Sequence, residues 1–307
     1  METTTMNKVY KVFPGGKFKV LTFSYDDGKI EDRRLVKLFN KFNLKATFNL
    51  NTGIIDPAIR IPQEEWPELY KGHDIAVHTF THPTMIRLND YNALREILDD
   101  KDNLEKIFKR PIYGLAYPNG SYDNRIVDIA KSVGIKYARV TNDKYAATKA
   151  AEAYAANADG PMLIGDENGF SMPEDYMCWV PTCHHNHNLI DFGKKFMALT
   201  KKQYLYMMYV WGHSYEFDRD NNWYVIEEFC KMIGGREDIW YATNAEVCHY
   251  LMAVKQVHTS VDEKLLFNGS GQDIYLIRNG ENILLHPGEL QRIHSPESHG
   301  KLRKIVL

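Results

Sequence analysis

Stretches typical of strands alternate with stretches typical of helices along most of this chain, and that alternation constrains the fold more than any other feature. Apolar runs at 18–24 and 204–211 are typical of buried strands, whereas 31–42 and 89–109 place apolar residues at helical spacing. The alternation recurs roughly seven or eight times before residue 255. It predicts an α/β protein with a parallel sheet or barrel, whose functional loops gather at the carboxyl ends of the strands.

The same patterns give the boundaries that we expect for the other elements. Thr243-Asn244-Ala245-Glu246 has the spacing of a capping box, in which the first and fourth residues bond each other's backbone at the start of a helix. Residues 158–175 are rich in Gly, Pro, Asp and Asn and predict a loop. The remaining strands are expected at 45–51, 74–78, 113–117, 135–140, 177–180 and 238–242, and the remaining helices at 63–71, 123–133, 144–157, within 188–202, at 220–233 and at 243–255.

The pattern changes at about residue 261, where short β runs and turns replace the helices. Runs at 274–277 and 283–285 flank Asn279-Gly280, and Asn-Gly is a strong signal for a two-residue hairpin turn. We therefore expect two parts: a main α/β domain over 1–260 and a small β-rich appendage over 261–307, which packs on the main domain because it is too short to be stable alone.

Composition and charge exclude several classes of protein. A hydrophobic content of 44% and a charged content of 25% are ordinary for a globular protein, and a net charge of −2 gives no basic patch for nucleic acid or anionic membrane. The chain has no 18-residue apolar span, and its first eight residues lack the apolar core of a signal peptide. We expect a cytoplasmic protein with no membrane or nucleic-acid partner, and we expect its four scattered cysteines to be free thiols.

Two adjacent carboxylates, Asp26 and Asp27, follow the first core strand. Neighbouring Asp side chains repel each other, so their position is better explained by a cation or a proton between them than by stability. Gly28 allows a sharp turn directly after the pair, which lets both side chains point into one cleft. Taken alone, Asp-Asp-Gly is also typical of an ordinary turn.

Histidines follow two other predicted strands. His78 and His82 begin where the strand 74–78 ends, and imidazoles four residues apart can converge on one zinc or cobalt ion. One Asp of the pair would complete a three-ligand site with an open position for water, and the other could act as a base. His213 ends the apolar strand 204–211 at the same edge of the sheet. Chance His pairs also occur in a chain with 12 histidines.

Four motifs occur in a fixed order: Tyr25-Asp26-Asp27-Gly28, His78-Thr79-Phe80-Thr81-His82, Ala116-Tyr117-Pro118-Asn119-Gly120 and Trp211-Gly212-His213. Together they resemble the motifs of the polysaccharide deacetylases, which form carbohydrate esterase family 4 with its NodB-homology domain. The resemblance covers residues 18–255. It implies a distorted (β/α) barrel of mostly parallel strands, with a divalent metal, that removes N-acetyl or O-acetyl groups from sugars. An acetylated sugar or oligosaccharide would be the partner.

The resemblance also assigns roles to residues. Asp27, His78 and His82 would bind one divalent ion, Zn²⁺ with Co²⁺ as the alternative, whose bound water attacks the acetyl carbonyl. Asp26 would be the general base, and His213 would be the general acid that protonates the departing amine. The backbone N–H of Asn119 would help to hold the oxyanion, and Tyr25, Pro118 and Trp211 would complete the contacts to the oxyanion and the substrate.

The chain departs from the family pattern in its third and fourth motifs. Ala116 stands where an arginine usually orients the catalytic Asp, and Arg139 on the next strand could supply a guanidinium instead, although an exposed strand-end arginine is more common. The carboxylate partner of His213 has no clear motif. Asp175, Glu216 and Asp218 are the candidates.

Other readings of the same residues remain open. The cluster Cys183-His184-His185-Asn186-His187 could bind a metal, but adjacent side chains diverge on a regular backbone, so we expect a loop that flanks the cleft. A hydrolase of a non-sugar carbon–nitrogen bond on the same scaffold is one alternative function. A non-catalytic carbohydrate-binding protein is the other, although binding alone would not require two Asp and three His at strand ends.

Overall fold

The computed structural model describes residues 8–141, 169–293 and 304–305, and its centre is an eight-stranded sheet in which every strand pair is parallel. The strand order is β6-β5-β4-β3-β2-β8-β7, and β9 pairs with the first half of β2. The bounds are β2 Lys19–Asp26, β3 Thr47–Leu50, β4 Asp74–Val77, β5 Gly114–Ala116, β6 Tyr137–Arg139, β7 Cys183–His184, β8 Tyr206–Gly212 and β9 Ile239–Tyr241.

The sheet curls until its two edges are joined by one segment. At one edge, Trp179 N donates to Ala138 O of β6 at 2.8 Å, and Val140 N donates to Trp179 O at 3.2 Å. A few residues later comes β7, the strand at the opposite edge, which pairs with β8, and Thr182 N donates to Tyr209 O at 2.7 Å. The predicted α/β barrel of seven or eight mostly parallel strands is confirmed.

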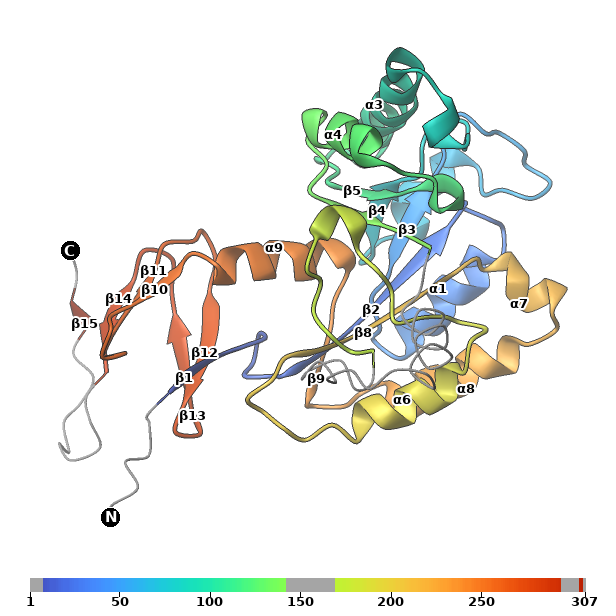
Figure 1. Cartoon of the computed structure of the whole chain (residues 1–307). Helices are drawn as coiled ribbons and strands as arrows, with labels where there is room; N and C mark the ends of the chain where they lie inside the picture. The colour runs from blue at the N-terminus through green and yellow to red at the C-terminus, as the bar shows by residue number, and fades with distance from the viewer. Residues whose placement is uncertain (1–7, 142–168, 294–303, 306–307) are drawn as a thin grey trace, which may run out of the picture.

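Amphipathic helices cover the outside of the barrel, as their spacing predicted (Figure 1). In α1, the side chains of Leu35, Val36 and Phe39 are buried against the sheet, and Phe39 packs on Phe23 of β2 with ring centroids 4.6 Å apart. Burial of each such side chain contributes about 1.5–3 kcal/mol to the hydrophobic term. The helix bounds are α1 Asp32–Lys41, α2 Trp66–Leu69, α3 Asp90–Phe108, α4 Asn124–Ser132, α6 Leu189–Met197, α7 Tyr215–Arg219, α8 Trp223–Ile233 and α9 Asn244–Val254.

Local signals give the correct start for α9. Thr243 is its N-cap: Glu246 N donates to Thr243 Oγ1 at 3.2 Å, and Thr243 N donates to Glu246 Oε2 at 2.8 Å. The predicted capping box is confirmed. It could be predicted because both bonds join residues only three positions apart in the sequence.

The C-terminal region forms two small antiparallel sheets, ordered β1-β12-β13 and β10-β11-β14-β15 (Figure 1). Asn279 and Gly280 make the predicted turn between β12 and β13. The first sheet also includes β1, which the polar N-terminal sequence did not indicate. The bounds are β1 Val9–Val12, β10 Val257–Thr259, β11 Leu265–Asn268, β12 Ile274–Arg278, β13 Glu281–Leu285, β14 Leu290–Arg292 and β15 Lys304–Ile305. The division at residue 260 stays a prediction.

Some expected elements differ from the structure. The strand expected at 177–180 is a 3-10 turn, Tyr176–Cys178, followed by a single bridge between Trp179 and Arg139, because the chain crosses the barrel edge there. The helix expected at 144–157 and most of the loop 158–175 lie outside the described residues. Within the described part of the chain, every helix is too short or too polar to cross a bilayer.

Candidate active site

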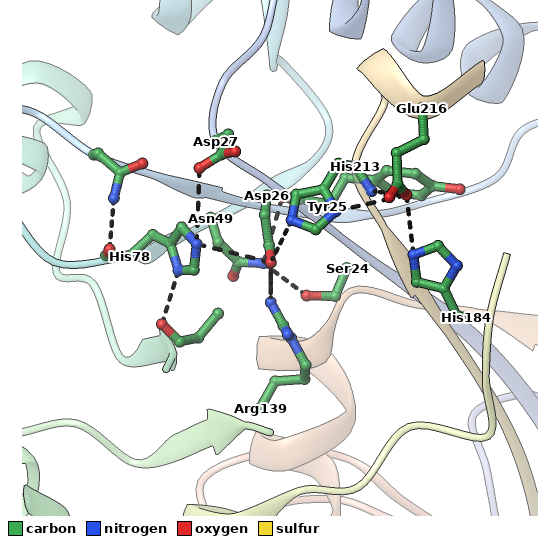
Figure 2. Close-up of polar contacts among 12 residues, drawn as sticks. Ser24, Tyr25, Asp26, Asp27, Asn49, His78, Arg139, His184, His213 and Glu216 are labelled. Atoms are coloured by element: carbon green, nitrogen blue, oxygen red, sulfur yellow. Dashed lines mark hydrogen bonds and ion pairs between the residues drawn. The ribbon is translucent and has the colours of Figure 1, made fainter. Parts of the chain in front are cut away.

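The candidate active site begins at the carboxyl end of β2, the central strand. Asp26 is the last residue of β2 and is 2% exposed. Asn49 Nδ2 on β3 donates to Asp26 Oδ1 and to Ser24 Oγ, each at 2.7 Å. Asp26 therefore points into the barrel, and Figure 2 shows it at the centre of the polar contacts. Asp27 comes next with φ = 81°, a left-handed conformation that turns the chain out of the strand.

Arg139, at the end of β6, forms a buried ion pair with Asp26. Its Nη2 contacts both carboxylate oxygens, with Oδ1 at 2.5 Å. Arg139 is only 1% exposed, so it is not the exposed strand-end arginine that is the more common case. Its register partner on β5 is Ala116. The guanidinium therefore enters the barrel beside the position where the family usually has its arginine.

The surroundings of Asp26 hold the pKa of its carboxyl well below the ordinary value. Burial by itself would raise this pKa, but the Arg139 guanidinium lowers it most strongly, followed by His78 and His213. Asp26 is therefore ionised at neutral pH.

Asp27, His78 and His82 form a group that could hold a metal ion, because their ligand atoms all lie within 4.8 Å of one another. The histidines come from the turn after β4, where Thr79 and His82 have φ of 66° and 57°. These left-handed residues bend the chain back, so the rings of His78 and His82 lie 4.7 Å apart. The turn, rather than a helix, brings the two imidazoles together.

The hydrogen bonding of His78 fits a metal ligand. Its Nδ1 lies 2.8 Å from Ala116 O, and since a carbonyl can only accept, Nδ1 carries the proton. The lone pair of Nε2 then faces the carboxylates, 3.7 Å from Asp26 Oδ2 and 3.9 Å from Asp27 Oδ1. Nε2 is buried and lacks a hydrogen-bond partner among the described residues. Burial also lowers the pKa of His78 to about 4, which keeps it in the neutral form that binds metals.

His213 follows β8 and faces Asp26 from the other side. Its Nε2 lies 3.7 Å from Asp26 Oδ2, and its Nδ1 lies 3.5 Å from Glu216 Oε2 in α7. Of the three candidate partners, Glu216 is thus the one in contact. Asp175 accepts from Met177 N instead, and Asp218 accepts from Trp223 Nε1. Burial alone would lower the pKa of His213, but Glu216 and Asp26 raise it above its ordinary value.

His184 and His185 both contact the same carboxylate oxygen, and the turn that begins after His184 agrees with the loop expected for this cluster. Their Nε2 atoms lie 2.9 and 3.2 Å from Glu216 Oε2. The regular strand ends at His184, and the turn that follows allows both rings to converge. His185 is then stacked on Phe217, with ring centroids 4.1 Å apart.

Hydrogen bonding makes His184, His213 and Glu216 a poorer metal site, although their ligand atoms also lie within 4.8 Å of one another. The backbone N–H of Asn186 donates to His184 Nδ1 at 3.2 Å, so the proton of His184 is on Nε2 and points at Glu216. A metal would need that nitrogen deprotonated. The geometry instead describes one carboxylate in contact with three imidazoles, those of His184, His185 and His213.

The predicted substrate contacts have different surroundings. Trp211 is partly buried, and the Arg139 guanidinium lies 4.7 Å from its ring. Asn119 is exposed, with φ of 55°. Pro118 is buried, and Tyr25 is fully buried with its ring stacked on His185 at 5.7 Å. The structure therefore places Tyr25 in the core beneath the site.

The sequence reasoning missed two residues that organise the site. Asn49, which bonds Asp26, had a usable signal, because a buried amide side chain in the mostly apolar stretch 46–50 of a core strand needs a polar partner. Arg60 contacts Asp27 but lies in a loop, where a lone arginine is usually exposed and solvated.

Comparison with known proteins supports the family resemblance of the sequence motifs. Residues 14–138 match the family model described as polysaccharide deacetylase. No curated protein matches the chain. Among solved structures, a putative polysaccharide deacetylase from Mycobacterium smegmatis is 14% identical over 81% of this chain and 95% of that chain, with a TM-score of 0.55. This likeness supports the fold.

Two further structures are similar to this chain. The deacetylase PplD of Streptococcus pyogenes, solved with acetate, is 27% identical over 39% of this chain, with a TM-score of 0.38; this chain spans 55% of its length. The peptidoglycan deacetylase PdaC of Bacillus subtilis is 16% identical over 80% of this chain and 97% of that chain, with a TM-score of 0.46. The family model and the fold therefore support the resemblance to the polysaccharide deacetylases.

Replacing Arg139 by Met should destabilise the protein at pH 7, because it leaves the Asp26 carboxylate buried without its cation. Loss of one partner from a buried pair costs about 3–5 kcal/mol. Urea unfolding should show this loss, and the double variant Asp26→Asn/Arg139→Met should recover most of it.

The difference in stability between wild type and Arg139→Met should become smaller at low pH. Because the folded-state pKa of Asp26 is lowered, its contribution is present above the unfolded pKa of about 4 and is lost as the pH falls toward the folded value. The gap between wild type and Arg139→Met should therefore narrow below about pH 4. Equal stabilities of the two proteins at pH 7 would contradict the ion-pair interpretation.

Proposed function

We propose that this protein is a metal-dependent hydrolase that removes N-acetyl, or alternatively O-acetyl, groups from a carbohydrate. The observation that supports this best is the position of Asp26, whose Oδ2 lies 3.7 Å from His78 Nε2 and 3.7 Å from His213 Nε2. A base thus lies between a group able to hold a cation and an acid. Amide hydrolysis needs these three functions within reach of one carbonyl group.

Asp27, His78 and His82 would hold one divalent ion. Two imidazoles and one carboxylate suit Zn²⁺, with Co²⁺ as the alternative. Bound there, the ion would supply a Lewis acid for the acetyl carbonyl and lower the pKa of a water beside it.

Asp26 and His213 would move the protons. Asp26 stays ionised because of Arg139, so its Oδ2 can take a proton from the attacking water. Glu216 favours the protonated form of His213, whose Nε2–H can then be given to the leaving nitrogen. An amine leaves poorly as an anion, so this proton is needed for the carbon–nitrogen bond to break.

The substrate would contact the loop after β5 and the end of β8. The backbone N–H of Asn119 would stabilise the oxyanion, since its left-handed conformation turns the chain at the exposed rim of the barrel. Trp211 would contact the sugar. The resemblance to the polysaccharide deacetylases supports an acetylated carbohydrate as the substrate, and so does the group of residues that could hold a divalent ion.

The two alternative functions have less support than the sugar deacetylase. The absence of an arginine at position 116 would favour a non-sugar carbon–nitrogen hydrolase, but Arg139 makes an ion pair with Asp26 in its place. A non-catalytic binding protein would not need a buried, ionised Asp26 between two histidines.

Acetate release is the direct test of the proposed function. The purified protein is incubated with N-acetylated and O-acetylated mono-, oligo- and polysaccharides and with non-sugar acetamides, each with and without added Zn²⁺ or Co²⁺. We expect metal-stimulated acetate release from at least one N-acetylated carbohydrate. Release from the non-sugar amides alone would favour the alternative hydrolase, and no release from any substrate would contradict both.

Two variants separate the metal site from the base. Asp26→Asn should keep about one divalent ion per chain and lose roughly 10²- to 10⁴-fold in kcat, because only proton transfer is removed. His78→Ala should lose the ion itself. Elemental analysis and acetate release on the same samples measure both properties. If His78→Ala keeps its metal, the assigned ligand set is wrong.

Glu216→Gln should change the pH profile of the reaction. A general acid works only while protonated, so activity is lost as the pH rises through the pKa of His213. Glu216 raises that pKa, and its neutral replacement should move the alkaline limb of kcat/KM to lower pH. Asp218→Asn is the matched control, because Asp218 lies in the same helix but bonds Trp223. Identical limbs for Glu216→Gln and wild type would exclude Glu216 as the partner of the acid.

A further inference from the structure

The loop after β3, residues 51–61, lies between the two turns that contain the candidate metal ligands. Toward the β2 turn, Ile61 N donates to Gly28 O at 3.0 Å, and Ile30 N donates to Ile59 O at 3.2 Å. Toward the β4 turn, Gly53 N donates to Phe80 O at 3.0 Å. A Cβ at Gly53 would come within 2.5 Å of that same oxygen, so the close approach requires glycine.

Two buried side chains of this loop extend the connection into the site. Arg60 is 8% exposed and Asn51 is 1% exposed. Arg60 Nη1 donates to the backbone carbonyl of Asp27 and to Asn51 Oδ1, the latter at 3.1 Å. Asn51 Nδ2 in turn donates to the carbonyls of His78, at 2.5 Å, and of Thr79, at 2.9 Å. A continuous chain of hydrogen bonds thus links Asp27 to the turn that contains the two histidines.

This chain of bonds ends at two residues whose backbone conformation is unfavourable for a residue other than glycine. Asp27 and Thr79 both have φ in the left-handed region, which non-glycine residues keep only when their surroundings fix it. The Arg60 fork holds the carbonyl of Asp27, and Asn51 holds the carbonyl of Thr79. Both bonds end on main-chain atoms, so they fix the turns themselves and leave the ligand side chains available.

We propose that Arg60 and Asn51 form a positioning bridge that holds the Asp27 turn and the His78–His82 turn at the separation needed to bind a divalent ion. This inference rests on the proposed metal-dependent function. Arg60 has a second effect, because its Nη2 lies 3.6 Å from Asp27 Oδ1 and offsets part of the carboxylate charge before an ion is bound. Neither residue is assigned a contact with substrate.

The planar fork of arginine matters more than its charge in this bridge. Arg60 Nη1 makes both bonds, to Asp27 O and Asn51 Oδ1, while Nη2 of the same rigid plane faces Asp27 Oδ1. Lysine has the same charge, but its one nitrogen on a flexible stem cannot occupy both positions in a fixed geometry. Arg60→Lys therefore breaks the bridge and retains the local charge. Asn51→Ala removes the bonds to the carbonyls of His78 and Thr79 and the acceptor for Arg60.

The test measures the affinity of the metal-free protein for Zn²⁺ by competition with a chromophoric chelator. We expect Arg60→Lys and Asn51→Ala each to weaken Zn²⁺ binding by about 10- to 100-fold, the range typical of residues that orient metal ligands. Both residues act in one chain of bonds, so their effects should not add. The double variant should bind Zn²⁺ only slightly less tightly than the single variant with the lower affinity. Arg33→Lys is the matched control, since Arg33 forms an exposed pair with Glu65 and should leave the affinity unchanged.

A second measurement separates positioning from general stability. The visible spectrum of the Co²⁺-loaded protein reports ligand geometry, and the bridge variants should change its band positions or intensities, whereas Arg33→Lys should not. Loss of thermal stability in the metal-free variants, with wild-type Zn²⁺ affinity and an unchanged Co²⁺ spectrum, would overturn the bridge. If one variant fails to fold, the other is interpreted alone.

The outcome also distinguishes the bridge from the proposed function. A wild-type protein that binds Zn²⁺ and releases acetate, with variants of equal affinity, would refute the bridge only. A wild-type protein that binds no divalent ion would refute the metal-dependent function, and the bridge with it.

Discussion

The buried ion pair between Asp26 and Arg139 is the interaction on which the rest of the site depends. An isolated carboxylate at this depth would take up a proton, because burial alone raises its pKa. The pair reverses that tendency and leaves a charged, hydrogen-bonded oxygen inside the barrel. It also spans the barrel: β2 and β6 are separated by three strands in the sheet, so their side chains meet only because the sheet curls.

Further charged and imidazole side chains surround this ion pair. Asp26 lies between Arg139 and the imidazoles of His78 and His213, and Glu216 contacts His184 on β7 and His213 after β8. The opposite hydrogen-bond patterns of His78 and His184 give these two clusters different chemistry. The carbonyl of Ala116 accepts the proton on His78 Nδ1, so the lone pair of His78 Nε2 is available to a cation. The N–H of Asn186 donates to His184 Nδ1, so His184 Nε2 carries the proton.

The elements predicted from the sequence are those defined by local periodicity. The core strands, the long helix α3 and the capping box of α9 agree with the structure because their signals lie within a few residues. Strand β1 was missed because it is set by pairing with β12, whose residues are more than 250 positions away. The short strand β7 and the convergence of His184 and His185 were missed because they depend on the closure of the barrel.

The sequence by itself determined the alternation of strands and helices and the placement of Asp26, Asp27, His78, His82 and His213 at strand ends. In a parallel sheet these ends share one edge, so proximity of the five residues follows from the alternation alone. Only the tertiary structure decided the partners of those residues. Arg139 for Asp26, Glu216 for His213 and the Arg60–Asn51 chain across the metal-ligand turns all depend on which loops become neighbours and which side chains meet across the barrel. Asp26 and Arg139 are more than 100 positions apart, so no local pattern encodes their contact. Glu216 is only three residues from His213, but it was one of three candidates until the fold placed it in contact with that ring.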